Sequence, residues 1–304
     1  MRIGIGTSIV GQQIVGGVQY LDEVGGTPTA AYSVDKVVST YTDAVVEVRR
    51  TVSAVTVEAD VAFDGDTITL DSAVTITSGS SSATTLGEFV AASGYTDVDS
   101  LGSPQDAFVA TWYDQAGSND ATQTTASDQP KIVSAGALVT ENGKVALNFD
   151  GVNDYFTASF SSSQPIFVSL VVKNVKSGVQ FPYYFDSNNS NRFLLYVENT
   201  NGITASANYV DPNVLRSTIT KTVQSLISVS YNTASSFLAI DGNIAVSGTI
   251  ESNSIVAPLY IGARNNQSQQ MTGTYQELII YNSDKSALRT AIEGNINGRF
   301  SIYA

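Results

Sequence analysis

The 304-residue chain carries 15 Lys and Arg against 28 Asp and Glu, which gives a formal net charge of −13, and 42% of its residues are hydrophobic. An acidic protein repels the phosphate backbone, so we exclude genome packaging and other nucleic-acid binding. Only 14% of the residues are charged, so the polar surface must consist mostly of Ser, Thr, Asn and Gln. That composition is typical of a protein built from strands and turns.

The sequence contains neither Cys nor His. The absence of Cys indicates assembly in a reducing cytoplasm, and the absence of His removes the commonest general base and metal ligand. Residues 1–17 lack the continuous apolar region of a signal peptide, and no stretch reaches the roughly 20 apolar residues of a membrane helix. We therefore expect a protein with no cofactor and no membrane association.

The first half of the chain predicts an arm followed by a lobe. Residues 1–31 are rich in Gly, and two interpretations of this N-terminal arm are open: it docks on a neighbouring subunit, or it is a mobile terminus. Residues 32–140 are predicted to form a lobe of mixed α and β structure. Apolar residues at i, i+3, i+4 and i+7 predict a short helix over 33–41, and a second short helix is predicted over 84–93.

The second half of the chain predicts an antiparallel β-sandwich over residues 141–304. Alternating apolar and polar residues recur at short intervals, and Asn142-Gly143 is a two-residue hairpin signal. Many short strands without intervening helices indicate two packed antiparallel sheets. A closing helix is predicted over 284–297, with Ser283 as its N-cap. The expected strands are IFVSLVVKN, RFLLYVEN, SLISVSYN, SFLAIDGNIAVSG, APLYIGAR and YQELIIYN.

Two Asp-containing turns leave a metal site open. Asp64 and Asp66 flank a glycine in a predicted hairpin, and the segment 149–154 carries two more aspartates. Carboxylates in such turns are calcium ligands in some proteins. A solvated or capped turn is the simpler interpretation, because Asp accepts hydrogen bonds from nearby backbone N–H groups.

The segment Trp112-Tyr113-Asp114-Gln115 ends a predicted strand. In the structural interpretation, Trp112 or Tyr113 anchors the core while Asp114 and Gln115 satisfy backbone groups of the following turn. In the functional interpretation, these side chains line a sugar site. We favour the structural interpretation, because turn chemistry accounts for every residue.

The best candidate for a glycan-binding surface is an aromatic strand followed by polar residues. Sugars bind where aromatic faces contact C–H groups while amides, carboxylates and guanidinium groups bond the hydroxyls. Aromatic residues of a sandwich strand also serve as core and cross-strand pairs, which is the competing interpretation. The candidate residues are Tyr183, Tyr184, Asp186, Asn189 and Arg192.

Several segments resemble a known family. Their succession is similar to the front of the α-L-arabinofuranosidase B catalytic-domain family and to a set of phage structural proteins that share these segments. The piece from Trp112 to Gln123 is the most specific part of the resemblance. The segments are AAYSVDKVVSTY, VVEVRR, ATWYDQAGSNDATQ, DQPKIV and GKVALNFDGVNDYF.

The end of the chain, from Tyr260 to Tyr303, is similar to the last strands and closing helix of laminin-G-like, concanavalin A-like domains, an ending that phage tail-fibre and other virion proteins carry. Together the resemblances cover residues 30–304. They imply a mostly β protein with a concanavalin A-like jelly-roll sandwich, a smaller N-terminal α+β lobe and a short C-terminal helix.

The chain departs from the arabinofuranosidases in its lack of Cys and in the absence of a recognisable nucleophilic Glu segment. Retaining hydrolysis requires two carboxyl groups about 5 Å apart. Glu198 at the end of one strand and Glu277 within another are expected to be surface residues. We therefore predict a chain that is not an enzyme.

The resulting prediction is a structural protein of a tailed phage particle: a capsid decoration, a head fibre or a tail-associated module that displays its sandwich. It is expected to assemble in the host cytoplasm, to reside in the virion in contact with other capsid or tail proteins, and to be a homo-oligomer or multi-copy component. Two alternatives stay open. The sandwich binds host-surface carbohydrate as a receptor or adhesion module, or the chain is a glycoside hydrolase.

Overall fold

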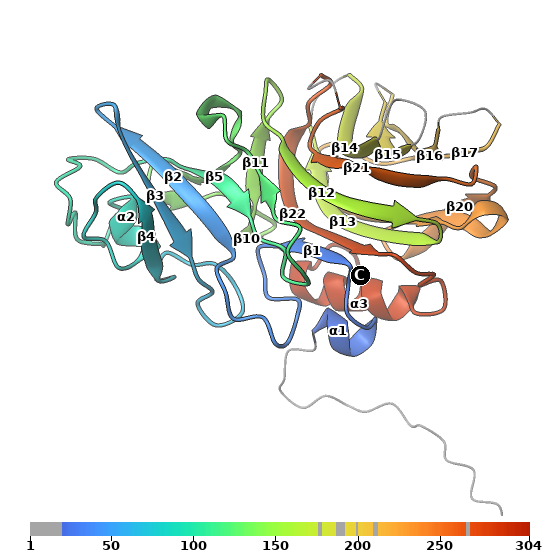
Figure 1. The fold of residues 1–304 in the computed structure, drawn as a ribbon, viewed down its shortest axis with the longest axis horizontal. Coiled ribbons are helices and arrows are strands. Elements are labelled where there is room, and N and C mark those ends of the chain that lie inside the picture. The colour runs from blue at the N-terminus through green and yellow to red at the C-terminus, as the bar shows by residue number, and fades with distance from the viewer. Residues whose placement is uncertain (1–19, 176–177, 187–191, 199, 209–211, 266–267) are drawn as a thin grey trace, which may run out of the picture.

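Two antiparallel β-sheets lie face to face in the C-terminal part of this computed structural model, and a smaller lobe adjoins them (Figure 1). Among the described residues, 20 strands are connected by hydrogen-bonded pairing into one continuous sheet, which curls back on itself. The predicted fold class, a mostly β antiparallel sandwich with a small lobe and a short C-terminal helix, is confirmed. The structure describes residues 20–175, 178–186, 192–198, 200–208, 212–265 and 268–304.

One sheet, the helix-side sheet, has its outer face covered by the C-terminal helix (Figure 1). It consists of β1 (Ala30–Ser33), β11 (Leu147–Asp150), β13 (Ile166–Asn174), β18 (Ser225–Tyr231), β19 (Ser236–Ile240), β20 (Asn243–Gly248) and β22 (Thr272–Tyr281). β22 runs through its middle, because Leu278 pairs with Leu170 of β13 on one side and with Tyr32 of β1 on the other. The N-terminal strand is thus an integral part of the sandwich.

The other sheet, the outer sheet, lies across the core from the helix-side sheet. In spatial order it consists of β12 (Phe156–Ser163), β21 (Ser254–Ile261), β14 (Gln180–Asp186), β15 (Arg192–Val197), β16 (Gly202–Ala207) and β17 (Val214–Thr218). Successive side chains of a strand point to opposite faces. One set of residues on each of these strands therefore enters the core, and the alternate set faces away from it.

The lobe extends the helix-side sheet. Its elements are β2 (Val46–Val52), β3 (Val55–Val61), β4 (Val74–Ser78), α2 (Leu86–Phe89), β5 (Ala107–Trp112), β6 (Ala121–Thr122), the 3₁₀ turn Ala126–Asp128, β7 (Lys131–Ser134), β8 (Ala137–Leu138), β9 (Thr140–Glu141) and β10 (Lys144–Val145). Pairing runs β4–β3–β2–β5–β7–β11, so β11 joins the lobe to the sandwich. β9 and β10 form the predicted hairpin, whose turn is Asn142-Gly143.

One hydrophobic cluster runs through the described residues from Leu21 to Phe300. It includes residues of the predicted arm, lobe and sandwich, among them the fully buried Trp112. Residues 1–19 of the predicted arm lie outside the described residues, whereas the next residues form α1 (Leu21–Val24) and β1. The division at residues 31 and 140 stays a prediction, and its second boundary falls inside β9.

The helix predicted over 33–41 is wrong. The backbone carbonyls of Ser33 and Asp35 accept hydrogen bonds from Gln115 Nε2 at 3.1 and 3.0 Å, and Val37 N donates to Gln115 Oε1 at 2.9 Å. These groups would otherwise form the i to i−4 ladder of a helix. A glutamine side chain from a distant segment therefore holds this stretch in a non-helical path.

Both other predicted helices are shorter or shifted. The second helix is reduced to the single turn of α2, where Thr85 Oγ1 accepts from Glu88 N at 3.2 Å. The last helix is α3 (Arg289–Phe300) and does not begin at Ser283. Asp284 accepts hydrogen bonds from the backbone N–H and hydroxyl of Ser286, which makes a local turn in place of a helical start. Among the described residues, no helix is long and apolar enough to cross a membrane.

Candidate functional site

Trp112 anchors the core, as the structural interpretation of its segment predicts. Its side chain is fully buried, and its ring centroid lies 5.9–6.2 Å from those of Tyr32, Phe156 and Tyr275. These tilted and edge-on contacts are the preferred geometries for aromatic pairs.

Asp114 satisfies backbone groups of the following turn, as predicted, whereas Gln115 bonds instead to backbone groups of the distant segment 33–37. Asp114 is buried, and its Oδ1 accepts from Ala31 N at 2.8 Å and from Ala116 N at 3.0 Å. Its Oδ2 accepts from the backbone and side-chain amides of Asn119, both at 3.2 Å. The two side chains thereby fix the path of the chain into and beyond β1.

Tyr113 lines an acidic depression of about 440 Å³ with Asp43, Asp60 and Asp120. Tyr113 OH donates to Asp60 Oδ1 at 2.7 Å, and Asp120 Oδ1 accepts from the backbone N–H of Asp114 at 2.9 Å. Burial, ahead of the nearby Glu47 charge, raises the pKa of Asp60. No group of three or more acidic residues in the described part of the chain is arranged to hold a metal ion.

The aspartates of the two Asp-containing turns accept hydrogen bonds from their own turns and, for Asp66, from Tyr20 just before α1. Asp64 Oδ2 accepts from Thr69 Oγ1 at 2.7 Å, and Asp66 Oδ1 accepts from Tyr20 OH at 2.9 Å. In the second turn, Asp154 Oδ2 accepts from the backbone N–H of Asp150 at 2.7 Å. Both turns therefore have the capped geometry of the simpler interpretation.

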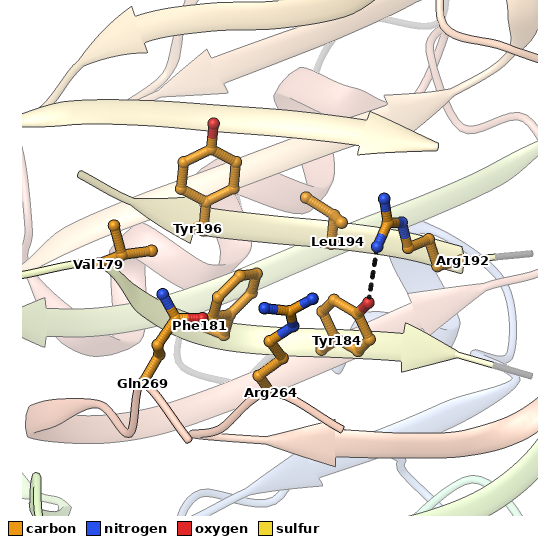
Figure 2. Close-up of a pocket in the computed structure, with 8 residues that line it drawn as sticks. All are labelled: Val179, Phe181, Tyr184, Arg192, Leu194, Tyr196, Arg264 and Gln269. Atoms are coloured by element: carbon orange, nitrogen blue, oxygen red, sulfur yellow. Dashed lines mark hydrogen bonds between the residues drawn. The ribbon is translucent and has the colours of Figure 1, made fainter. Parts of the chain in front are cut away.

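A separate aromatic cluster lies on the face of the outer sheet that points away from the core. It contains Phe181, Tyr184, Leu194 and Tyr196, and Tyr260 packs against it. Tyr184 pairs with Leu194 on one side and with Tyr260 on the other, so these side chains share one face. Together with Val179, Arg192, Arg264 and Gln269, residues of the cluster line a cavity of about 270 Å³ (Figure 2).

Two guanidinium groups flank Tyr184 in this cavity (Figure 2). Arg192 donates from Nη1 to Tyr184 OH at 3.2 Å and from Nη2 to the carbonyl of Asn208 at 2.9 Å. Arg264 follows β21 and enters the cavity between Phe181 and Tyr184. The Nε atoms of both arginines are buried without a hydrogen-bond partner among the described residues.

The predicted glycan-binding residues do not all lie on the same face of the outer sheet. Tyr184 and Arg192 line the cavity, whereas Tyr183 points into the core, fully buried, with its hydroxyl 2.6 Å from that of Tyr231. Burial, reinforced by Tyr231, holds the pKa of Tyr183 well above its ordinary value. Asp186 pairs with Arg192 in the strand register, but its side chain and all of Asn189 lie outside the described residues. Glycan binding by this set stays a prediction.

Sequence reasoning missed Val179, Leu194, Tyr196, Arg264 and Gln269 as lining residues. A signal for two of them was present, because Arg192, Leu194 and Tyr196 alternate along one strand and so share a face. Arg264 reaches the cavity only because β21 pairs with β14, which local periodicity does not reveal.

The two glutamates expected at the surface have different environments. Glu198 is half-buried just after β15, and its Oε1 accepts from Thr204 Oγ1 at 3.0 Å. Thr204 pairs with Tyr196, so Glu198 lies on the same face as the aromatic cluster. For Glu277 the expectation is wrong: it is fully buried and forms an ion pair with Arg299 of α3.

Solved structures of α-L-arabinofuranosidases share this architecture. A GH54 enzyme soaked with a cyclic sulfate inhibitor matches 93% of this chain and 65% of its own, with 14% identity and a TM-score of 0.61. A GH54 mutant soaked with 4-nitrophenyl α-L-arabinofuranoside gives the same coverage and identity with a TM-score of 0.63. An arabinofuranosidase complexed with arabinofuranosyl-α-1,2-xylobiose matches 91% and 64%, with 14% identity and a TM-score of 0.60.

This chain thus spans just under two thirds of the length of these enzymes, and the likeness shows a shared fold. No model of a known protein family matches the sequence, and no curated protein matches it significantly. The class that the comparisons define is therefore a fold: a β architecture that solved arabinofuranosidases also have.

The prediction that the chain is not an enzyme is contradicted by these comparisons. Arabinofuranosidases share its architecture over more than nine tenths of its length, so the fold is compatible with glycoside hydrolysis. The failure to assign two carboxylates from the sequence was no ground for exclusion, because strands distant in sequence bring side chains together on one face.

Proposed function

We propose that this chain binds carbohydrate in the cavity on the outer sheet. The observation that carries this proposal is an aromatic cluster on the face of the sheet that the sandwich core does not use. Core packing accounts for Tyr183 and its neighbours on the inner face, but not for four large apolar side chains on the opposite one. A mostly apolar cavity with a few convergent polar groups is the usual form of a small-ligand site.

The lining supplies the contacts that a saccharide requires. The rings of Phe181, Tyr184 and Tyr196 lie together, with centroid separations of 5.3 and 5.6 Å from Phe181 to the other two, and offer apolar surface to sugar C–H groups. Arg192 and Gln269 provide N–H donors, and Gln269 also provides an amide acceptor for hydroxyl groups. This arrangement supports the predicted partner, a host-surface carbohydrate.

Tyr196→Ala is expected to weaken carbohydrate binding about tenfold or more, because it removes one wall of the cavity. The measurement is a glycan array followed by titration calorimetry on the best saccharide. Tyr95→Ala, which removes a partly buried tyrosine from the lobe, is the matched control and should bind as the wild type does. The absence of binding to every saccharide, or equal binding by both variants and the wild type, would contradict the proposal.

We further propose that the chain is a component of a tailed phage particle, present in several copies and in contact with capsid or tail proteins. The resemblance of its segments to phage structural proteins over residues 30–304 supports this. Quantitative mass spectrometry of gradient-purified particles should detect the chain in a fixed ratio to the major capsid protein. Its absence from particles would refute the virion role without affecting carbohydrate binding.

Glycoside hydrolysis is the second candidate function. It is favoured by the architecture shared with arabinofuranosidases and by Glu198, whose carboxylate lies on the same face as the aromatic cluster. Incubation with an aryl α-L-arabinofuranoside tests it: release of the aryl alcohol by the wild type and not by Glu198→Gln would establish hydrolysis. No release at high protein concentration would count against it.

A further inference from the structure

The cavity on the outer sheet differs in charge from the rest of this acidic protein. Of the described residues that line it, two are arginines and none is Asp or Glu, although acidic residues outnumber basic ones by 28 to 15 in the whole chain. The depression beside Tyr113 has the opposite character, since four aspartates line it. The cavity is therefore a local positive site on a negatively charged molecule.

Arg264 is half-buried, and its contacts differ from those of the buried and half-buried arginines that lie outside the cavity. Arg50, Arg289 and Arg299 are each paired with a carboxylate, namely those of Asp99, Glu293 and Glu277. Arg49 instead donates to the Gln129 and Thr51 side chains and to the carbonyl of Ala126. No carboxylate among the described residues pairs with Arg264, and its Nε lacks a hydrogen-bond partner.

A buried N–H donor without an acceptor is unfavourable unless a ligand or another group satisfies it, and the Nε–H of Arg264 is such a donor. A guanidinium group presents parallel N–H donors in one plane, and this geometry matches the two oxygens of a carboxylate. Figure 2 shows the Arg264 guanidinium beside the rings of Phe181 and Tyr184, with Arg192 on the far side of Tyr184. A sugar ring held against these aromatic groups would bring a substituent on its edge to the guanidinium groups.

We propose that the saccharide bound by this cavity carries a carboxylate, as hexuronic acids do, and that Arg264 recognises it with support from Arg192. This inference rests on the proposed carbohydrate binding and adds the chemical class of the ligand. The carboxylate supplies an acceptor for the Arg264 Nε–H. The positive charge of the cavity attracts the carboxylate and so offsets the repulsion from the acidic surface of the protein. A neutral saccharide offers no charged acceptor to the Arg264 guanidinium group, so its affinity is lower.

The test compares oligosaccharides of glucuronic or galacturonic acid with their carboxyl-reduced, neutral counterparts by titration calorimetry. The wild type is expected to bind the acidic form about tenfold more tightly than the reduced form. Arg264→Gln should bring this ratio to within twofold. Arg216→Gln makes the same change on β17 of the same sheet, outside the cavity lining, and should retain the full ratio.

The outcomes separate this inference from the proposed function. If neither form binds, carbohydrate binding itself fails. If both forms bind equally and Tyr196→Ala weakens both, carbohydrate binding stands and recognition of a carboxylate is refuted. A preference for sulfated over carboxylated saccharides would also refute it, and a ratio unchanged in Arg264→Gln would exclude Arg264 as the recognising group. Melting curves of each variant show whether the fold is retained.

Discussion

Glu277→Gln lowers the free energy of unfolding by about 3–5 kcal/mol, the cost of breaking a buried ion pair by removing one partner. Glu277 is fully buried on β22, and its Oε1 accepts from Arg299 Nη2 at 2.8 Å. Its Oε2 accepts from Arg299 Nη1 and from Ser33 Oγ, the latter at 2.8 Å. The carboxylate thus connects β22, α3 and β1, and its loss leaves the largely buried Arg299 guanidinium without a counter-charge.

Urea unfolding followed by circular dichroism measures this effect. The double variant Glu277→Leu with Arg299→Met is the informative control, because replacing both charges with apolar groups removes the uncompensated charge. We expect it to be more stable than Glu277→Gln alone. A loss below about 1 kcal/mol in Glu277→Gln, the range of exposed ion pairs, would show that this pair contributes little.

Asp154 makes the protein less stable as the pH rises from about 4 to 7. Burial raises the pKa of Asp154 to about 7; the backbone N–H of Asp150 opposes this rise, and the charges of Asp150 and Asp128 add to it. The folded state therefore holds a proton that the unfolded state has already lost above pH 4. Since folding binds a proton in this window, stability is complete below it and falls as the pH rises through it.

Asp154→Asn removes this dependence while its side-chain oxygen still accepts from Asp150 N. Near pH 4 the variant and the wild type should have equal stability. At pH 8 the variant should be more stable by up to ~4 kcal/mol, which corresponds to three pKa units. Thermal melts across this pH range measure the difference, and Asp43→Asn, at an exposed position, should follow the wild-type curve. Parallel curves for Asp154→Asn and the wild type would refute the assignment.

The two aromatic segments have different roles in the fold of this molecule. The segment from Trp112 to Gln115 carries the most specific part of the resemblance, yet its side chains pack the core and bind backbone groups of β1. The cavity residues come from a less distinctive part of the sequence. A distinctive sequence motif can therefore stabilise a fold without forming a binding site.

The candidate site was only partly predictable from the sequence, because the alternation of side chains along a strand does not show which face each one occupies when the register contains a bulge. A bulge between Gln180 and Tyr183 shifts the register of β14, so Phe181 and Tyr184 share the cavity face while Tyr183 enters the core. The sequence places all three in one aromatic run. Which of them faces the cavity depends on the bulge in β14, and the pattern of residues in the run does not reveal that bulge.

The sequence by itself determined the strands, their turns and the antiparallel sandwich, because alternation of apolar residues and the chemistry of Asn-Gly turns act over a few neighbouring residues. Only the tertiary structure decided the non-helical path after β1, the burial of Glu277 and the cavity containing Arg264. Gln115 contacts Val37 across 78 positions, Arg299 reaches Glu277 from another element, and Arg264 joins Tyr184 through the pairing of β21 with β14. Each of these contacts is set by packing between distant segments, which local patterns cannot specify.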